Sequence, residues 1–151
     1  MLILKRTDSA DTDFIELVKL LDTDLALRNG EQHAFYSQFN TTDTIKNVVV
    51  AYLNHKAVSC GAFKYYNENT VEVKRMFTVH EFRGKGLAAS ILKELETWAA
   101  ELGYTRSVLE TGKKQTEALN LYQKSNYQLI PNYGQYAGIE NSLCFQKFIK
   151  V

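Results

Sequence analysis

The sequence predicts an α/β (α+β) sandwich in which a mixed, mostly antiparallel sheet of about six or seven strands carries helices on both faces. Runs rich in β-branched and aromatic residues alternate with amphipathic runs of helical period. Three strand-like runs follow one another with links of two or three polar residues, which favours hairpins. A long helical run then separates the last of these from the next strand-like run, which predicts at least one βαβ crossover.

The composition limits the classes of function. The chain has 151 residues without a repeat or a Pro- or Ser-rich linker, so residues 1–151 are predicted to form a single domain. With 18 Lys and Arg against 17 Asp and Glu, the formal charge of +1 argues against a nucleic-acid partner. No apolar run is long enough for a signal peptide or a membrane span. We therefore expect a cytoplasmic protein without a membrane partner.

The first half of the chain predicts one strand, two helices and an antiparallel meander. A strand over residues 2–7 precedes a helix that Asp8 or Ser9 would cap. Apolar residues recur along that helix at mostly helical spacing: Phe14, Leu17, Val18, Leu20, Leu21 and Leu25. A second, shorter helix is predicted over residues 31–39. The strands of the meander are predicted over residues 47–53, 56–66 and 70–79.

In the second half, the apolar period changes from about two to about 3.6, the value for a helix. The long helix begins at Leu87 and ends at Gly103, and one of its faces is apolar: Leu87, Ile91, Leu95, Trp98 and Leu102. Further elements are expected as a strand over 105–110, a helix over 115–125, a short strand over 127–130 and a last strand over 142–149. A tyrosine-rich loop precedes the last strand.

The turn Arg83-Gly84-Lys85-Gly86 places two glycines between two cations directly in front of the long helix. The free amides at a helix N-terminus donate hydrogen bonds, and the helix dipole favours negative charge there. Glycine allows the backbone to approach a ligand closely. This turn therefore predicts a binding site for a phosphate group.

Two familiar phosphate-binding patterns fit the turn poorly. No window satisfies the P-loop pattern. Residues 84–89 match the dinucleotide-binding pattern, and Glu110 stands where that pattern expects an acid for the ribose. However, the strand before the turn carries Glu72, Lys74 and Arg75 instead of a continuous apolar run, and only about 40 residues follow Glu110. A dinucleotide-binding domain is thus a less favoured alternative.

A third pattern, R-x-x-G-x-A, is spelled by residues 83–88. With KRMFTV before the turn, LET at 109–111, and LY followed by SNY within 121–127, the chain resembles the GNAT superfamily of acyl-CoA-dependent N-acyltransferases. The resemblance covers residues 70–130 well and the whole chain in element order. It implies that acetyl-CoA is the cosubstrate and that the turn holds its pyrophosphate, through Arg83, Gly84, Lys85, Gly86, Leu87 and Ala88.

Acetyl transfer from a thioester to an amine requires a neutral amine, a stabilised oxyanion and a proton for the departing thiolate. The resemblance implies that Tyr122 is the acid, although Tyr122 also shares a helical face with Ala118 and Leu119 and would fit a core position. It points to Glu72 as a base acting directly or through water, the alternative being an ordinary solvated carboxylate. Glu110 is the rival: it would act as a base, orient the amine, or merely bond to neighbouring backbone.

The resemblance also implies contacts to the coenzyme through the main chain. The backbone amides of Phe77, Thr78 and Val79 would hold the oxyanion and the pantetheine arm. Gln115 stands where many relatives carry an asparagine that contacts the coenzyme, which leaves this contact open. These expectations place the donor at the end of one strand and the starts of two helices.

Aromatic residues are expected around the acceptor. Tyr133 and Tyr136 in the loop before the last strand would border the acceptor site or serve as packing lids, and Phe35 and Tyr36 would add to the same surface. The acceptor class expected is a primary amine, a small molecule rather than a protein. Transfer would be direct, through a ternary complex. A non-catalytic sensor that binds acyl-CoA is the alternative function.

Three further expectations concern metals, thiols and assembly. No metal is expected, because His33, His55 and His80 lack ligand spacing. Cys60 and Cys144 are predicted to be buried free thiols. The oligomeric state is open, with a homodimer as one option, since strand edges at the end of such sheets often pair between subunits.

Overall fold

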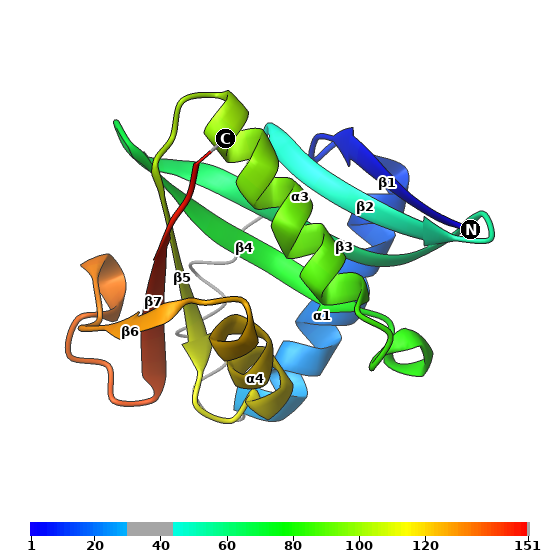
Figure 1. The fold of residues 1–151 in the computed structure, drawn as a ribbon. Coiled ribbons are helices and arrows are strands. Elements are labelled where there is room, and N and C mark those ends of the chain that lie inside the picture. The colour runs from blue at the N-terminus through cyan, green and yellow to red at the C-terminus, as the bar shows by residue number, and fades with distance from the viewer. Residues whose placement is uncertain (30–43, 151) are drawn as a thin grey trace.

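The computed structural model describes residues 1–29 and 44–150, which form a seven-stranded mixed sheet with helices on both faces (Figure 1). The elements are β1 (Leu2–Thr7), α1 (Thr12–Asn29), β2 (Asn47–Leu53), β3 (Lys56–Asn67), β4 (Thr70–Thr78), α3 (Leu87–Glu101), β5 (Arg106–Gly112), α4 (Thr116–Lys124), β6 (Gln128–Ile130) and β7 (Ser142–Phe148). Two 3₁₀ turns, η2 (His80–Phe82) and η3 (Gly134–Tyr136), lie in the connections. The predicted fold class is confirmed. The helix predicted over 31–39, with His33, Phe35 and Tyr36, lies outside the described residues.

The strands follow the order β1-β2-β3-β4-β5-β7-β6 across the sheet. Among the strands described, β4 and β5 form the one parallel pair, and α3 is the crossover between them. The other pairs are antiparallel, including the predicted meander of β2, β3 and β4. A dinucleotide-binding fold needs a mostly parallel sheet, so this topology excludes that alternative.

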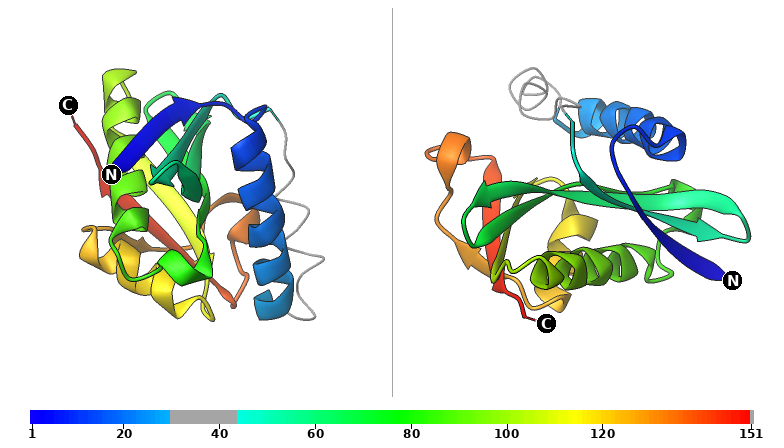
Figure 2. Two further views of the ribbon diagram at one scale, coloured as in Figure 1. Left: turned by 90° about the vertical axis from the view of Figure 1, so that its right-hand side faces the viewer. Right: turned by 90° about the horizontal axis from the view of Figure 1, so that it is seen from above.

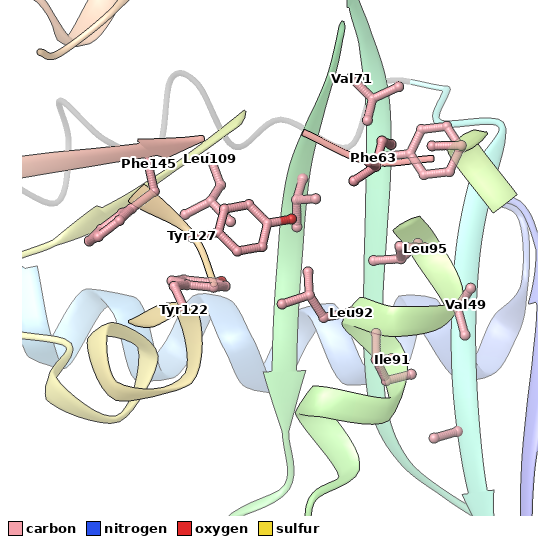
Figure 3. Packing of buried hydrophobic residues seen from close by; sticks show 14 residues of the cluster. Val49, Phe63, Val71, Ile91, Leu92, Leu95, Leu109, Tyr122, Tyr127 and Phe145 are labelled. Atoms are coloured by element: carbon pink, nitrogen blue, oxygen red, sulfur yellow. The ribbon is translucent and has the colours of Figure 1, made fainter. Parts of the chain in front are cut away.

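Two apolar layers hold the helices against the sheet, and Figure 2 shows α1 on one face with α3 and α4 on the other. On the first face, Phe14, Leu17 and Val18 of α1 pack on a cluster of buried strand residues: Val48, Val50, Cys60, Ala62 and Phe77. On the second face, the residues in contact come from α3, α4 and five strands, and Figure 3 shows most of them: Val49, Phe63, Val71, Ile91, Leu92, Leu95, Leu109, Tyr122, Tyr127 and Phe145.

The apolar periodicity of the sequence predicts these buried helix faces, except that two of the leucines assigned to them are exposed. Leu20 of α1 is 51% exposed, and Leu102, which lies just past the end of α3, is 56% exposed. Each occurs at helical spacing from a buried residue, but spacing alone does not show where the sheet stops covering the helix. Cys60 and Cys144 are buried and free, as predicted, and burial raises the pKa of the Cys60 thiol to about 12.

The cap of α1 also differs from the prediction. The Asp11 carboxylate accepts hydrogen bonds from the amides of Asp13 and Phe14, at 2.9 and 3.1 Å, so Asp11 caps the helix. Asp8 instead accepts from the amide of Ala10, and the Ser9 hydroxyl accepts from the amide of Ile45. The prediction of Asp8 or Ser9 was wrong because three capping residues occur within four positions, and their tertiary partners decide which one caps.

The strands β4 and β5 separate after a short paired region. They pair only from Thr70 to Glu72 and from Arg106 to Val108, although both strands continue (Figure 1). A β-bulge in β4 accompanies the separation, because Arg75 and Met76 stand opposite Gly61. A bulge bends the strand that contains it. The central strands of the sheet are therefore divided at their C-terminal ends.

Gly61 permits this bulge. A Cβ atom at residue 61 would lie 2.4 Å from Met76 Sδ and 2.7 Å from Ile91 Cγ2, both too close for any side chain. The bulge also holds Arg75 at a φ of 61°, in the left-handed region that non-glycine residues seldom adopt. A strained residue of this kind is kept only where the surrounding structure holds it.

Candidate active site

One cavity lies where β4 and β5 diverge, and its lining comes from both faces of the sheet. Leu21 and Leu25 of α1 line it on one face, whereas Tyr122 of α4 lines it from the other. The strands contribute residues 72–76, Glu110 and Thr111, and Gln115 and Tyr136 complete the lining. Because helices on opposite faces line the same cavity, it passes through the sheet between the two strands.

The two predicted carboxylates lie on the α1 face. Val71, Val73 and Leu109 belong to the apolar cluster beneath α3 and α4. Successive side chains of a strand point to opposite faces, so Glu72 and Glu110 face α1. The structure thus brings Glu72, Glu110 and Tyr122 to one cavity, with both carboxylates across the sheet from the phenol.

Glu72 is buried and already engaged. The Tyr133 hydroxyl donates to Glu72 Oε2 over 2.6 Å. Lys74 Nζ lies 3.8 Å from Glu72 Oε1, and burial lowers the pKa of this lysine. The alternative interpretation of Glu72 as an ordinary solvated carboxylate is therefore wrong, because this residue is 9% exposed and its carboxylate is hydrogen bonded.

Glu110 has an unused oxygen. Within the described part of the chain, its Oε2 atom is buried without a hydrogen-bond partner. Burial raises the pKa of Glu110 to about 7, although a hydrogen bond with Ser142 and the charge of Lys74 oppose this rise. A carboxylate with a pKa near neutrality is well suited to accept a proton at physiological pH.

Tyr122 combines a core position with a place in the cavity lining. Its ring packs against Tyr127 and Phe145, with ring centroids 5.8 and 6.2 Å away, so the core interpretation of the sequence holds as well. Burial, and to a smaller extent the Glu110 carboxylate, raise the pKa of Tyr122. The phenol therefore stays protonated at neutral pH and can act as a hydrogen-bond or proton donor.

The tyrosine-rich loop reaches the cavity. Tyr136 is buried and lines it, and Tyr133 contacts Tyr136 edge to face with 5.8 Å between ring centroids. Tyr66 at the end of β3 packs on Tyr133 at 5.3 Å. Sequence reasoning missed Tyr66, and the pair Tyr65-Tyr66 near the end of a strand gave no sign of which ring faces the loop.

The glycine turn has the geometry of an anion site. Gly84 and Gly86 have φ values of 78° and 80°, and no atom lies within 4 Å of a Cβ built on either, so both positions are open. Gly86 precedes α3 without a side-chain cap, and the first helical hydrogen bond runs from the Ser90 amide to the Gly86 carbonyl. The amides of residues 87–89 therefore have no acceptor within the helix.

The cations of the turn differ in their contacts. Arg83 Nε donates to the Thr78 carbonyl over 3.0 Å, and its guanidinium stacks on Phe77 and approaches Asp24. This side chain braces the turn against β4. Lys85 is exposed, with Nζ 5.5 Å from the centroid of the Phe82 ring. Lys85 is thus the cation of the turn that faces solvent.

The register of β4 shows which of the three backbone amides predicted to contact the coenzyme are free to do so. The Val79 amide donates to the Val58 carbonyl over 2.9 Å, so it is engaged with the neighbouring strand. Antiparallel strands bond through alternate residues, which turns the Phe77 amide toward β3 and the Thr78 amide toward the space left by β5. Of the three amides, Thr78 is the one placed to meet a ligand in that space.

Gln115 lies at the start of α4, where the resemblance places a coenzyme contact. It lines the cavity, and its side chain makes no hydrogen bond to cap the helix. Sequence reasoning did not assign Arg75 or Thr111 to the site, yet both line the cavity. The charge of Arg75 within a strand was visible in the sequence, but its position depends on the bulge.

Across residues 1–29 and 44–150, no three His, Cys, Asp or Glu side chains gather in a way that would hold a metal ion. No helix in these ranges has the length and apolar character to cross a membrane.

A mixed sheet divided between its central strands, with an anion site beside the division, defines the acyl-CoA N-acyltransferase class of fold. The family model described as the acetyltransferase (GNAT) family matches residues 14–127. The chain belongs to this family, and the resemblance seen in the sequence is confirmed.

Curated relatives and solved structures agree with this assignment. The IAA acetyltransferase of Azospirillum brasilense is 32% identical over 100 residues, which cover 66% of this chain and 65% of the relative. The uncharacterized N-acetyltransferase YsnE of Bacillus subtilis is 29% identical over 99 residues, covering 64% of this chain and 66% of that protein. The chain thus matches just under two thirds of the length of these relatives.

The structural likeness extends over the whole chain. A protein assigned as an acyl-CoA N-acyltransferase in Klebsiella pneumoniae has a TM-score of 0.82 at 24% identity, covering 99% of this chain and 98% of that one. A GNAT family acetyltransferase from Elizabethkingia anophelis with acetyl-CoA bound has a TM-score of 0.69 at 16% identity, covering 98% of both chains. At these identities the likeness establishes the fold.

Proposed function

We propose that the protein transfers an acetyl group from acetyl-CoA to a primary amine of a small molecule, directly and within a ternary complex. The observation that carries this proposal is the cavity through the sheet, with Tyr122 on the α4 side and two carboxylates on the α1 side. A donor entering from one face and an acceptor entering from the other meet between β4 and β5. Such an arrangement requires no covalent enzyme intermediate.

The donor belongs on the face of α3 and α4. The unpaired amides at the start of α3 would bind the pyrophosphate, as helix N-termini do for many phosphates. The pantetheine arm would then extend along the open edge of β4, past the Thr78 amide, toward Gln115 and Tyr122. The structure of the Elizabethkingia anophelis relative contains acetyl-CoA, and that of the Thermoplasma acidophilum PaiA N-acetyltransferase contains coenzyme A, which supports this choice of donor.

The acceptor approaches from the α1 face, where the carboxylates lie. We favour Glu110 over Glu72 as the proton acceptor, because Glu110 has an oxygen without a hydrogen bond and a pKa of about 7. Glu72 already accepts a hydrogen bond from the Tyr133 hydroxyl. Glu72 would hold the tyrosine loop in place and add negative charge beside the amine. In the sequence these two carboxylates are rivals, and their different contacts support Glu110 as the base.

The proton balance follows from these positions. Glu110 removes a proton from the ammonium, the neutral nitrogen attacks the carbonyl carbon, and the N–C bond forms as the C–S bond breaks. Tyr122 gives its proton to the departing sulfur, whose thiol has an ordinary pKa of about 8.5. After attack the nitrogen carries two protons: the amide keeps one, and the other restores the Tyr122 hydroxyl through solvent. Glu110 releases its proton to solvent. The products are an amide, free coenzyme A and one proton.

Location and assembly are parts of the same proposal. Two buried free thiols support a reducing compartment such as the cytoplasm. Leu129 on the edge strand β6 and Phe148 at the end of β7 are exposed, which supports association of two copies at this end of the sheet. Analytical ultracentrifugation of the purified protein measures this directly.

A screen of acetyl-CoA consumption across amine classes tests the activity. At least one small primary amine should release free coenzyme A at a rate that saturates with amine concentration. Initial rates at several fixed amine concentrations should give intersecting double-reciprocal lines, as a ternary complex requires. Parallel lines would contradict direct transfer, and binding of acetyl-CoA without turnover of any amine would favour the sensor alternative.

A further inference from the structure

Four buried side-chain atoms lack a hydrogen-bond partner among the described residues, and three of them belong to residues that line the cavity. These three are Arg75 Nη2, Glu110 Oε2 and Thr111 Oγ1. A buried polar group left unbonded destabilises the folded state, and such groups are rare in folded proteins. Their gathering around one cavity indicates that a ligand supplies the missing partners.

Arg75 is the least expected of the three. It is 6% exposed, sits in the β4 bulge, and its Nη1 atom donates to Asp22 of α1 over 3.0 Å. This ion pair fixes the guanidinium on the α1 side of the sheet, where the acceptor is proposed to enter. An arginine is always charged and presents several donors in one plane, so the unused Nη2 can still bind an anionic oxygen.

Two of these atoms, Arg75 Nη2 and Glu110 Oε2, specify the chemistry of a ligand on the α1 side of the cavity. Arg75 Nη2 can only donate, and it is best satisfied by an anion. Glu110 Oε2, when ionised, can only accept, and it is best satisfied by an ammonium group. The Thr111 hydroxyl can do either, but residue 111 shares a face of β5 with Leu109, so it lies on the α4 side of the cavity. Glu72 does not call for a ligand group, because its carboxylate already contacts Tyr133 and Lys74.

We propose that the acceptor is a small zwitterion, a primary amine that also carries a carboxylate, with the carboxylate bound by Arg75 and the amine beside Glu110. This inference rests on the proposed function, because it names the chemical class of the acceptor. It assigns Arg75 a role in specificity and leaves the proton transfers to Glu110 and Tyr122. Water molecules are the competing occupants of the cavity, since they too can bond all three atoms.

Matched ligand sets separate the two occupants. Each set contains an amino acid, the amine that lacks its carboxylate, and the amide that keeps its size without the negative charge; alanine, leucine, phenylalanine, glutamate and lysine provide five sets. Calorimetry measures the Kd of each ligand for the full chain saturated with coenzyme A. At least one amino acid should bind about tenfold or more tightly than both of its analogues. Equal affinity within every set, or no binding at all, would overturn the proposal.

Substitution of Arg75 tests whether this residue binds the carboxylate of the acceptor. Arg75→Gln should abolish the tenfold preference while leaving the affinity for coenzyme A unchanged. Arg106→Gln is the matched control, because Arg106 is in the same sheet and its Nε donates to the Gln146 side chain over 2.9 Å, outside the cavity lining. A preference that survives Arg75→Gln would overturn the proposal. Should Arg75→Gln fail to fold, the wild-type ligand sets decide by themselves.

Turnover of the same ligands distinguishes this inference from the proposed function. Equal kcat/KM for an amino acid and its decarboxylated amine would support acetyl transfer and overturn the role of Arg75. Tight binding of an amino acid without release of coenzyme A from acetyl-CoA would support the zwitterion site and remove the proposed function. If kcat/KM is about tenfold or more higher for the amino acid than for its decarboxylated amine, the result supports both the zwitterion site and the proposed acetyl transfer.

Discussion

The phenol of Tyr133 donates a hydrogen bond to the carboxylate of Glu72, with 2.6 Å between Oη and Oε2, although 61 positions separate the two residues in the chain. Glu72 lies in the last part of β4 that still pairs with β5, and Tyr133 lies in the loop before β7. Burial, together with the adjacent carboxylate, raises the pKa of Tyr133. The bond thus ties the tyrosine loop to the strand at the point where the sheet divides.

Removing this bond should weaken acceptor binding. We expect Tyr133→Phe to raise the KM for the amine and to lower the free energy of unfolding by about 1–2 kcal/mol, because Glu72 loses its donor while it stays buried. Affinity for acetyl-CoA should not change. Steady-state kinetics and urea denaturation measure the two effects. Tyr65→Phe is the control, since Tyr65 is 67% exposed, and an equal effect in both variants would contradict the role of this bond.

Tyr122 should matter for turnover more than for binding. In Tyr122→Phe the departing thiolate loses its proton donor, so we expect kcat to fall by about 10²–10⁴-fold, the usual range for loss of a general acid. The ring stays in the core, and the Kd for acetyl-CoA should stay within about twofold of wild type, too small a change to reflect a lost hydrogen bond to the coenzyme. Tyr104→Phe, another ring in the same apolar cluster, is the control. An unchanged kcat in Tyr122→Phe would remove this residue from the mechanism.

The pH dependence of activity should follow Glu110. Burial raises the pKa of this carboxyl to about 7, so wild-type kcat/KM should rise with pH through that value as the base becomes ionised. Glu110→Gln should be slower by about 10²–10⁴-fold at pH 8 and should lose this limb of the profile. If Glu72→Gln loses the limb and Glu110→Gln keeps it, the base is Glu72 instead.

The raised pKa of Glu110 should also make the free energy of unfolding depend on pH. Between pH 4.5, the ordinary pKa of a glutamate, and about 7, the folded state holds the Glu110 proton and the unfolded chain releases it. The contribution of Glu110 is therefore fully present below pH 4.5 and is lost as the pH rises through 7, which lowers the free energy of unfolding. At 1.36 kcal/mol per pKa unit, the loss approaches about 3 kcal/mol.

Urea denaturation of wild type and Glu110→Gln across this pH range measures the loss. The glutamine cannot ionise, so its stability relative to wild type should increase between pH 4.5 and 8. A difference that does not depend on pH would show that Glu110 titrates alike in the folded and unfolded states.

The two glycines that flank α3 allow the effect of backbone strain on stability to be separated from an effect on ligand binding. Gly86 and Gly103 flank the helix with φ values of 80° and 97°, and both have open space around a Cβ. Alanine at either should cost about 1–2 kcal/mol of stability, because a side chain is disfavoured in this region. Only Gly86→Ala should weaken acetyl-CoA binding, as measured by calorimetry, because its Cβ would project into the anion site. Equal losses of affinity in both variants would contradict the position of that site.

Local pattern predicts much of this fold, because the elements form from their own periodicity. The apolar face of α3 and the strand character of β2 to β4 follow from spacing that is visible in the sequence. The positive φ at residues 84 and 86 is likewise a local requirement, which glycine meets. Tertiary choices, such as Asp11 as the cap of α1, depend on partners far along the chain.

The candidate site is less accessible to such reasoning. Glu72 and Glu110 look alike in the sequence, but in the fold Tyr133 donates a hydrogen bond to Glu72, whereas one oxygen of Glu110 stays unbonded. Arg75 reads as a charged strand residue, and its burial beside α1 results from a bulge that Gly61 permits. Unpaired polar atoms arise only when several elements enclose them, so no pattern of residues predicts them.

Mass spectrometry with acetyl-CoA labelled in the acetyl group follows the acetyl carbon itself. The purified protein is incubated with labelled acetyl-CoA and a small primary amine, and both the protein and the amine are weighed, with Tyr122→Phe as the control. Direct transfer predicts that label appears on the amine as an amide, in step with release of coenzyme A, and that none accumulates on the protein. Label on the protein before the amine, or unlabelled amines throughout, would contradict it.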